Sequence, residues 1–257
     1  MCAVRFGILG LIEVHVAERE YRIPACRQRE LLAALLLSAN RVVSSQELVE
    51  RLWPARQPPR ADRTLHTHVM RLRKVLAAGA GERIVTRYPG YVVQVGADEL
   101  DADRFDAARA EGASAARRAD WRRAYSAACS ALSLWRGEPL LDVPDLAGRQ
   151  DTVCVLREQR LQVLETRMEA LIGLGGHAAA ATELSALVRE HPLHEGFAAL
   201  YMTALSRDGR RADALAAYQD TRKSLIAELG VEPSEELREL HQRILDGKVL
   251  LSTRSAG

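Results

Sequence analysis

Short segments near the N-terminus alternate apolar and polar positions. Alternation with a period of two predicts half-buried strands, and a proline or glycine commonly ends such a segment. The first three predicted strands surround Gly10 and end at Pro24, and two more flank a turn at Tyr88–Gly90, which predicts a hairpin. The predicted strands are Val4–Leu9, Glu13–Val16, Tyr21–Ile23, Ile84–Arg87 and Tyr91–Val95.

Between these strands the apolar spacing becomes helical. Leucines recur on one stripe of residues 27–39, and a second helix opens at Ser44 and runs to Trp53. Ser44 and Glu47 have the spacing of a capping box, in which the serine accepts from the amide of the third helical residue and the glutamate bonds back. A third helix, Asp62–Leu76, has steps of 4, 3 and 4 between its buried positions, namely Leu65, Val69, Leu72 and Leu76.

After Asp98 the strand pattern disappears and alanine-rich helical segments follow. His177–Ala180 matches Arg211–Ala214 at a shift of 34, the tetratricopeptide period, with Gly176 and Gly209 in the preceding turns. A degenerate third unit begins at Trp121, and residues 137–150 form an inserted loop. The predicted helices are Phe105–Ala119, Trp121–Trp135, Val153–Leu174, Ala178–Glu190, Glu195–Arg207, Ala212–Leu229 and Ser234–Leu245.

Charge divides the chain in the same way as the periodicity. Residues 1–96 contain 15 basic and 8 acidic residues, whereas residues 97–257 contain 21 basic and 26 acidic ones. A basic first part predicts a polyanionic partner, although many basic segments have none. The longest apolar run without charge, Leu31–Leu37, is far shorter than the roughly 20 residues of a membrane span. We expect no membrane partner, no signal peptide, and reduced cysteines in a cytoplasm.

The third helix offers side chains suited to DNA. Arg71 lies one turn from Thr67 and His68, away from the apolar stripe, and an arginine fork can take two acceptors on a guanine edge. Basic and hydroxyl side chains on the same face can bind phosphates and fix the register. The alternative is a solvated helix face. Arg87 and Tyr88, at the tip of the hairpin, favour DNA because a minor-groove probe would lie there. We expect Tyr91 in the core and Gly90 in a turn with positive φ.

These segments resemble a known family. Residues 63–74, together with Ile84–Tyr91, resemble the winged helix of response-regulator effector domains. The segments Phe6–Gly10 and Arg27–Leu32 resemble the Streptomyces antibiotic regulatory proteins, in which a bacterial transcriptional activation domain follows. Later segments agree with that domain: Leu134–Gly137, His191–Leu193, Ala214–Tyr218 and Glu228–Pro233.

The resemblance implies an α+β winged helix in residues 1–96, an all-α tetratricopeptide-like domain in 97–250 and a tail at 251–257. It implies a transcriptional activator of a secondary-metabolite gene cluster that binds tandem direct repeats in double-stranded DNA as a homodimer and recruits RNA polymerase. Arg71 resembles the base-reading arginine and Arg87 the minor-groove arginine of the wing. The full set of expected DNA contacts is Arg63, Thr64, Thr67, His68, Arg71, Arg73, Lys74, Thr86, Arg87 and Tyr88.

The loop Pro54–Arg60 resembles the segment that touches polymerase in winged-helix regulators. Arg56 and Arg60 are therefore the candidates for that contact, and the alternative is a proline-stiffened connector with solvated arginines. Trp53, Trp121 and Trp135 are expected to pack in cores rather than at interfaces.

Enzyme functions find little support in the sequence. The phosphate-cradling glycine loops, the nucleophile elbow and the zinc-binding HExxH pattern are all missing, and the two histidines His66 and His68 diverge on a helix, so we expect no catalytic site, no metal and no cofactor. Two other functions stay open. One is a protein-interaction adaptor that uses its helical repeats, and the other is a regulator controlled by a small molecule on the helical surface.

Overall fold

The computed structural model describes residues 4–17, 19–77 and 82–247. The chain packs as two compact units, and the units interleave along the sequence: the first comprises residues 1–109 and 130–160, and the second residues 110–129 and 161–257. The sequence predicts a domain boundary after residue 96, and that boundary stays a prediction. The predicted tail, residues 251–257, lies outside the described residues.

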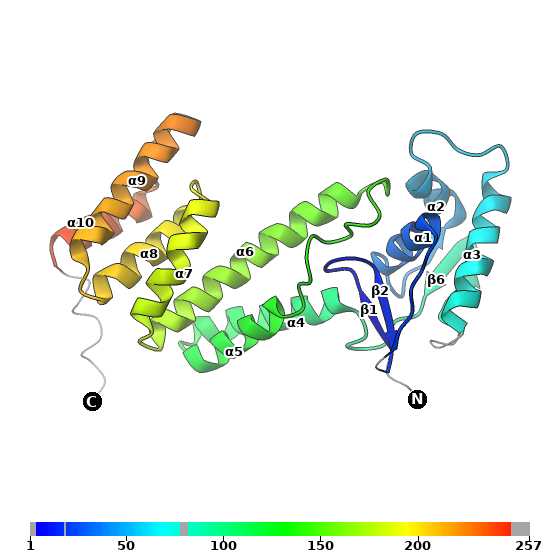
Figure 1. The fold of residues 1–257 in the computed structure, drawn as a ribbon, viewed down its shortest axis with the longest axis horizontal. Coiled ribbons are helices and arrows are strands. Elements are labelled where there is room, and N and C mark those ends of the chain that lie inside the picture. Colours follow the sequence, from blue (N-terminus) through cyan, green and yellow to red (C-terminus); the bar gives the residue numbers. More distant parts are fainter. Residues whose placement is uncertain (1–3, 18, 78–81, 248–257) are drawn as a thin grey trace. The chain divides into compact units, whose positions relative to one another are not determined.

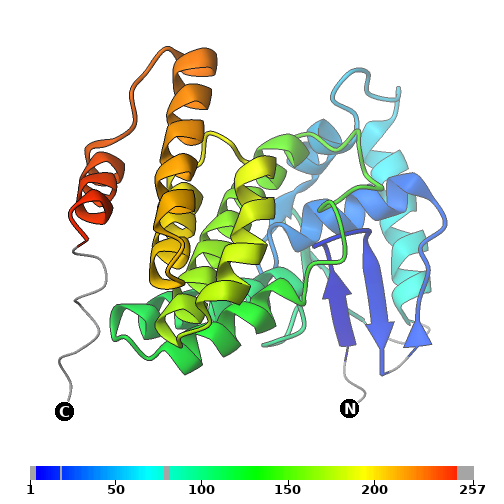
Figure 2. The ribbon, with the colours of Figure 1, turned by 60° about the vertical axis from the view of Figure 1, so that its left-hand side comes forward.

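A small antiparallel sheet opens the first unit (Figure 2). Its strands are β1 (Val4–Gly7), β2 (Glu13–Val16) and β3 (Arg19–Glu20), in the order β1-β2-β3. Alternation predicted β1 and β2, with β2 at its observed bounds, because one face of each strand is buried. The third strand was predicted wrongly at Tyr21–Ile23. It lies earlier, at Arg19–Glu20, where the register pairs His15 with Glu20.

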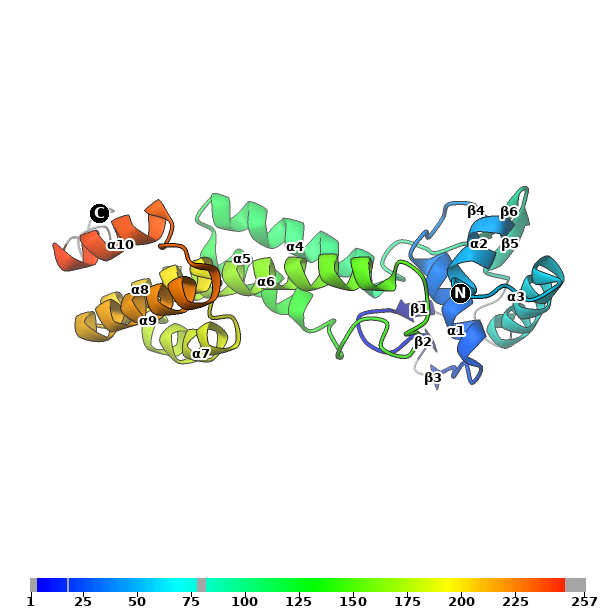
Figure 3. The ribbon, with the colours of Figure 1, turned by 90° about the horizontal axis from the view of Figure 1, so that it is seen from above.

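Three helices and a second sheet complete the winged-helix part (Figures 1 and 3). The helices are α1 (Cys26–Leu36), α2 (Ser45–Leu52) and α3 (Ala61–Ala77), and the strands are β4 (Val43–Ser44), β5 (Ile84–Arg87) and β6 (Gly90–Val93). The sheet order is β4-β6-β5, so β6 is central. Ser44 caps α2 as predicted by accepting from the Glu47 amide at 3.1 Å, but the Glu47 carboxylate pairs with Arg51 instead of bonding back.

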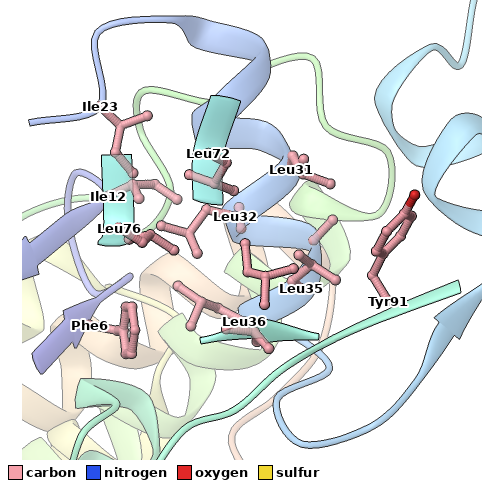
Figure 4. Close-up of a cluster of buried hydrophobic side chains, with 14 of the residues drawn as sticks. Phe6, Ile12, Ile23, Leu31, Leu32, Leu35, Leu36, Leu72, Leu76 and Tyr91 are labelled. Atoms are coloured by element: carbon pink, nitrogen blue, oxygen red, sulfur yellow. The ribbon is translucent and has the colours of Figure 1, made fainter. Parts of the chain in front are cut away.

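One apolar cluster joins these elements (Figure 4). It contains the leucines of α1 and the predicted stripe of α3, all buried, together with Tyr91. Three members come from much later in the chain: Leu140, Val143 and Leu146 are buried in the same cluster. The predicted insertion at 137–150 is therefore a turn-rich segment that contributes core residues to the first unit.

A buried carboxylate fixes the end of β1. Asp101, which is only 4% exposed, accepts from the amides of Ile8 and Leu9 at 2.9 and 3.0 Å and from the Arg136 guanidinium at 2.9 Å. Arg136 also pairs with Glu13 at 3.0 Å, and its amide donates to the Leu9 carbonyl. Residues near 101 and 136 thus hold the N-terminal sheet in place.

The remaining secondary-structure elements of the described chain are helices. Three of them have residues in both units: α4 (Asp101–Arg117), α5 (Trp121–Leu132) and α6 (Arg149–Gly173). The second unit continues with α7 (His177–Glu190), α8 (Glu195–Arg207), α9 (Arg211–Leu229) and α10 (Glu235–Leu245). Figure 2 shows the extended segment that joins α9 (orange) to α10 (red). No described helix is both long and apolar enough to cross a lipid bilayer.

The repeat in the second unit has a structural counterpart. The turns before α7 and α9 share one geometry, with Gly175 at φ +85° and Gly209 at φ +81°, and each glycine amide donates to the third residue before it. Gly175, not Gly176, is therefore the partner of Gly209, and the shift is the same 34 residues that relate the two helix starts. Ala119, at φ +55°, occupies the same position before α5, where the sequence predicts the degenerate third unit.

Candidate nucleic-acid interface

Helix α3 is amphipathic, which sets the orientation of its polar face. Its apolar stripe is buried against α1 and α2, so the opposite face is left to solvent. Asp62 lies in the first turn and Lys74 in the last, which complements the helix dipole at both ends. The Thr64 amide donates to the Arg60 carbonyl at 3.0 Å, so the helical pattern of hydrogen bonds reaches back into the preceding loop.

The solvent face of α3 has several cationic side chains. Arg63, Arg71 and Lys74 are exposed, and none of their side chains makes a hydrogen bond or ion pair with another described residue. A hollow of about 470 Å³ lies along the helix, and its lining residues are Arg60, Arg63, Thr64, Thr67, His68 and Arg71. The hollow therefore brings together five of the residues predicted to contact DNA, namely Arg63, Thr64, Thr67, His68 and Arg71. Unpaired cations in this arrangement favour an anionic partner.

Two threonines on this face direct their hydroxyls into the helix. Thr64 donates to the Arg60 carbonyl at 3.0 Å, and Thr67 donates to the Arg63 carbonyl at 2.9 Å. Phosphate oxygens only accept hydrogen bonds. Each hydroxyl must therefore rotate away from its backbone partner before it can donate to a phosphate.

His68 is half-buried beside α2. Its ring lies 6.0 Å from that of Trp53, and its buried Nδ1 has no hydrogen-bond partner among the described residues. Burial, aided by the positive charges of Arg71 and Arg27, lowers the pKa of His68 below its ordinary value of 6.5. At neutral pH the ring is uncharged, so it can offer a phosphate a hydrogen bond but no charge.

The tip of the β5–β6 hairpin projects into solvent. Arg87 is exposed, and the Tyr88 side chain is 98% exposed. Tyr91 is buried, as predicted, and its hydroxyl lies 3.4 Å from His66 Nδ1. The prediction of positive φ at Gly90 was wrong. A Cβ there would lie 2.7 Å from Ser44 Cα and still closer to the Val43 carbonyl, so glycine is needed because β4 passes so near.

Arg73 and Thr86 differ from their neighbours because they contact each other. The Arg73 guanidinium donates to the Ile84 carbonyl at 2.9 Å and to the Thr86 hydroxyl at 2.8 Å. They lie at a second hollow, of about 800 Å³, between α3 and β5. Its lining also includes Met70, which is 50% exposed. The spacing of Met70 from Thr67 and Lys74 places it on this face of α3.

The two arginines proposed for polymerase contact lie in different surroundings. Arg56 is exposed in the loop before α3, whereas Arg60 lines the α3 hollow beside Arg63 and Thr64. The sequence contained a signal for this position: Arg60, Thr64, Thr67 and Arg71 step by 4, 3 and 4, the spacing of one helix face. Arg60 therefore extends the cationic face of α3 by one turn.

Comparison with known families gives two matches in chain order. Residues 25–93 match the model described as "Transcriptional regulatory protein, C terminal", and residues 100–245 match "Bacterial transcriptional activator domain". The regulatory protein DnrI of Streptomyces peucetius is 36% identical over 94% of this chain and 92% of its own length. The chain belongs to the Streptomyces antibiotic regulatory protein family. This membership confirms the fold class expected from the sequence, a winged helix followed by a helical domain.

Two further relatives are longer proteins. The regulatory protein AfsR of Streptomyces coelicolor is 42% identical over 99% of this chain, which spans only 25% of AfsR. The structure titled "Mycobacterium tuberculosis EmbR in complex with low affinity phosphopeptide" matches with a TM-score of 0.92 and 29% identity, over 98% of this chain and 69% of that one. The chain thus corresponds to about a quarter of the length of one relative and to most of another.

Proposed function

We propose that this protein is a sequence-specific DNA-binding transcriptional activator of a secondary-metabolite gene cluster. The observation that carries the proposal is the solvent face of α3, where the exposed side chains of Arg63, Arg71 and Lys74 have no partner among the described residues, and Arg63 and Arg71 line one hollow. Family membership supports it, since the relatives DnrI and AfsR are both regulatory proteins. Localisation in the cytoplasm follows from the proposal.

In the proposed mode, α3 enters the major groove. The 17 residues of α3, at about 1.5 Å per residue, are long enough to cross the groove. Arg71 reads a guanine edge with its fork, while Arg63 and Lys74 hold phosphates. The exposed side chains of Arg87 and Tyr88 reach the adjacent minor groove. Two protomers bind side by side on tandem direct repeats.

Recruitment of RNA polymerase is the proposed mode of activation. Arg56 is the better candidate for that contact, because it is exposed and lies away from the residues that line the α3 hollow. Arg60, which lines that hollow, is proposed to support DNA binding instead. We expect Arg56→Ala to lower transcription from a target promoter in vitro at unchanged DNA affinity, and Arg60→Ala to lower both.

Selection from a random duplex library at near-physiological salt tests the proposal. We expect enrichment of a short motif repeated on one strand, with copies about one helical turn apart. On the selected site, Arg71→Ala should lower affinity by about 1–3 kcal/mol and relax the preference at one base position. Arg122, exposed on α5 and unpaired among the described residues, is the matched control, and Arg122→Ala should bind as the wild type does.

An unselective pool would contradict the proposal. If retention is equal for all sequences and collapses as salt rises, only the phosphate backbone is bound. The helical repeats would then be the functional surface, as in the adaptor hypothesis. A rise in thermal stability with small pathway metabolites would support the ligand-controlled alternative.

A further inference from the structure

A charged side chain of α3 contacts the wing, the hairpin of β5 and β6. Arg73 is half-buried near the end of α3, and its guanidinium spans the gap to β5, where it donates to the Ile84 carbonyl and the Thr86 hydroxyl. The guanidinium carbon also lies 5.8 Å from the centre of the Tyr91 ring on β6. Arg73 therefore contacts both strands of the hairpin.

The Ile84 carbonyl needs a partner of this kind. Strand β5 lies at the edge of its sheet, and the Gln94 amide donates to the Arg83 carbonyl at 2.7 Å. In an antiparallel pair the residues that bond to the neighbour alternate, so the Ile84 carbonyl points away from β6 toward the open edge. Arg73 satisfies that carbonyl with an ionised donor, and such bonds are among the stronger ones in proteins.

The same guanidinium leaves Thr86 ready to donate. Because the Thr86 oxygen accepts from Arg73 at 2.8 Å, its own hydroxyl proton stays available for another acceptor. A phosphate oxygen is such an acceptor. This differs from Thr64 and Thr67, whose hydroxyl protons are already donated to helix carbonyls.

We propose that Arg73 is a positioning residue, which holds the wing against α3 and orients Thr86 toward the DNA backbone. The Arg73 guanidinium binds to the hairpin, whereas Arg71 and Lys74, whose side chains have no partner among the described residues, contact the nucleic acid. This revises the sequence-based expectation that Arg73 is itself a phosphate contact. The inference rests on the proposed DNA-binding function only for the role of Thr86, since the hold on the wing is a property of the free protein.

The first test needs no DNA. Arg73→Lys keeps the charge but loses the planar fork, and Thr86→Val removes the accepting oxygen with little change in shape. We expect Arg73→Lys to speed amide hydrogen exchange at Val85 and Val92, which face each other on β5 and β6, by roughly tenfold, the size expected for a lost hydrogen bond to a charged group. Lys74→Ala, the matched control, should leave that exchange unchanged.

The second test uses the duplex obtained by selection. We expect Arg73→Lys and Thr86→Val each to weaken DNA binding by about tenfold. The double variant should bind little worse than either single variant, because both substitutions remove the same contact between Arg73 and Thr86. Arg73→Lys should keep the wild-type dependence of affinity on salt, whereas Lys74→Ala should reduce the slope by about one phosphate contact.

Unchanged wing exchange in Arg73→Lys would overturn the proposal, as would an Arg73→Lys variant that keeps full affinity. Failure of the wild type to select any duplex would instead refute the proposed function. The exchange experiment would then still decide whether Arg73 holds the wing.

Discussion

Replacing Asp101 with alanine tests how the first sheet is held. The carboxylate is 4% exposed and accepts from the amides of Ile8 and Leu9, which are 2% and 0% exposed. Alanine removes the acceptor from the amides of two buried residues at once. Arg136 also loses a partner, but it keeps its ion pair with Glu13 at 3.0 Å.

The magnitude follows from the number of groups left without partners. An unsatisfied buried amide costs about 1–3 kcal/mol, so two amides cost roughly 2–6 kcal/mol. We expect a loss of about 4 kcal/mol, a large part of the roughly 5–15 kcal/mol by which a typical domain is stable. Native-state hydrogen exchange at Ile8 and Leu9 measures this loss locally, and urea unfolding measures it for the whole chain.

Asp103 provides the matched control. It lies in the same first turn of α4 and has the same favourable position relative to the helix dipole, but it is exposed and bonds to no strand. Although Asp103 is exposed, partial loss of its hydration and the nearby negative charges of Asp106 and Asp101 raise its pKa, so its removal also relieves repulsion. Asp103→Ala should change stability by less than about 1 kcal/mol. An Asp101→Ala effect as small as this, with unchanged exchange at Ile8, would refute the reasoning.

Three further predictions concern the winged-helix part. Gly90→Ala should destabilise it by at least about 2 kcal/mol in urea, because the new Cβ meets the Val43 carbonyl and Ser44 backbone; full stability would show that β4 can move away. Ser44→Ala should cost about 1 kcal/mol by the same measurement, since the Glu47 amide loses its cap, and a neutral result would mean that water replaces it. The lowered pKa of His68 means that the unfolded chain binds its proton more readily, so stability should fall as pH drops below about 6.5. His68→Gln should flatten this slope between pH 7.5 and 5.5, and an unchanged slope would assign it to other groups.

The elements with a buried face were predictable from the sequence. Helix α3 was predictable from the stripe that includes Leu65 and Leu72, because those positions must lie on one face of the helix to be buried together. Strand β4, two residues long, was missed, since it exists only because Val43 pairs with Tyr91 on β6. Strand β3 was misplaced for a similar reason: its position depends on the register with β2 rather than on its own apolar pattern.

The candidate site was predictable as a set of residues but not as a set of contacts. Helical spacing placed Arg71 and Thr67 on one solvent face, and the structure brings both to the same hollow. The partners of Arg73 depend on where the hairpin folds back, and spacing along α3 contains no information about that. Gly90 shows the same limit. Glycine is required there because the neighbouring strand β4 leaves no room for a Cβ, and not because of the backbone conformation of its own turn.

Gly7 and Gly10 extend this argument to the core of the first unit. A Cβ on Gly7 would lie 3.0 Å from Arg136 Cζ, and one on Gly10 would lie 3.1 Å from Arg136 Cβ. Glycine is therefore required at both positions, because the Arg136 side chain, which bonds to Asp101, packs against them. Leu140 is buried in the same unit and donates its amide to the Ile8 carbonyl at 3.1 Å. A substitution at Arg136 should thus alter the sheet of β1, β2 and β3, although Arg136 lies within the segment that matches the bacterial transcriptional activator domain.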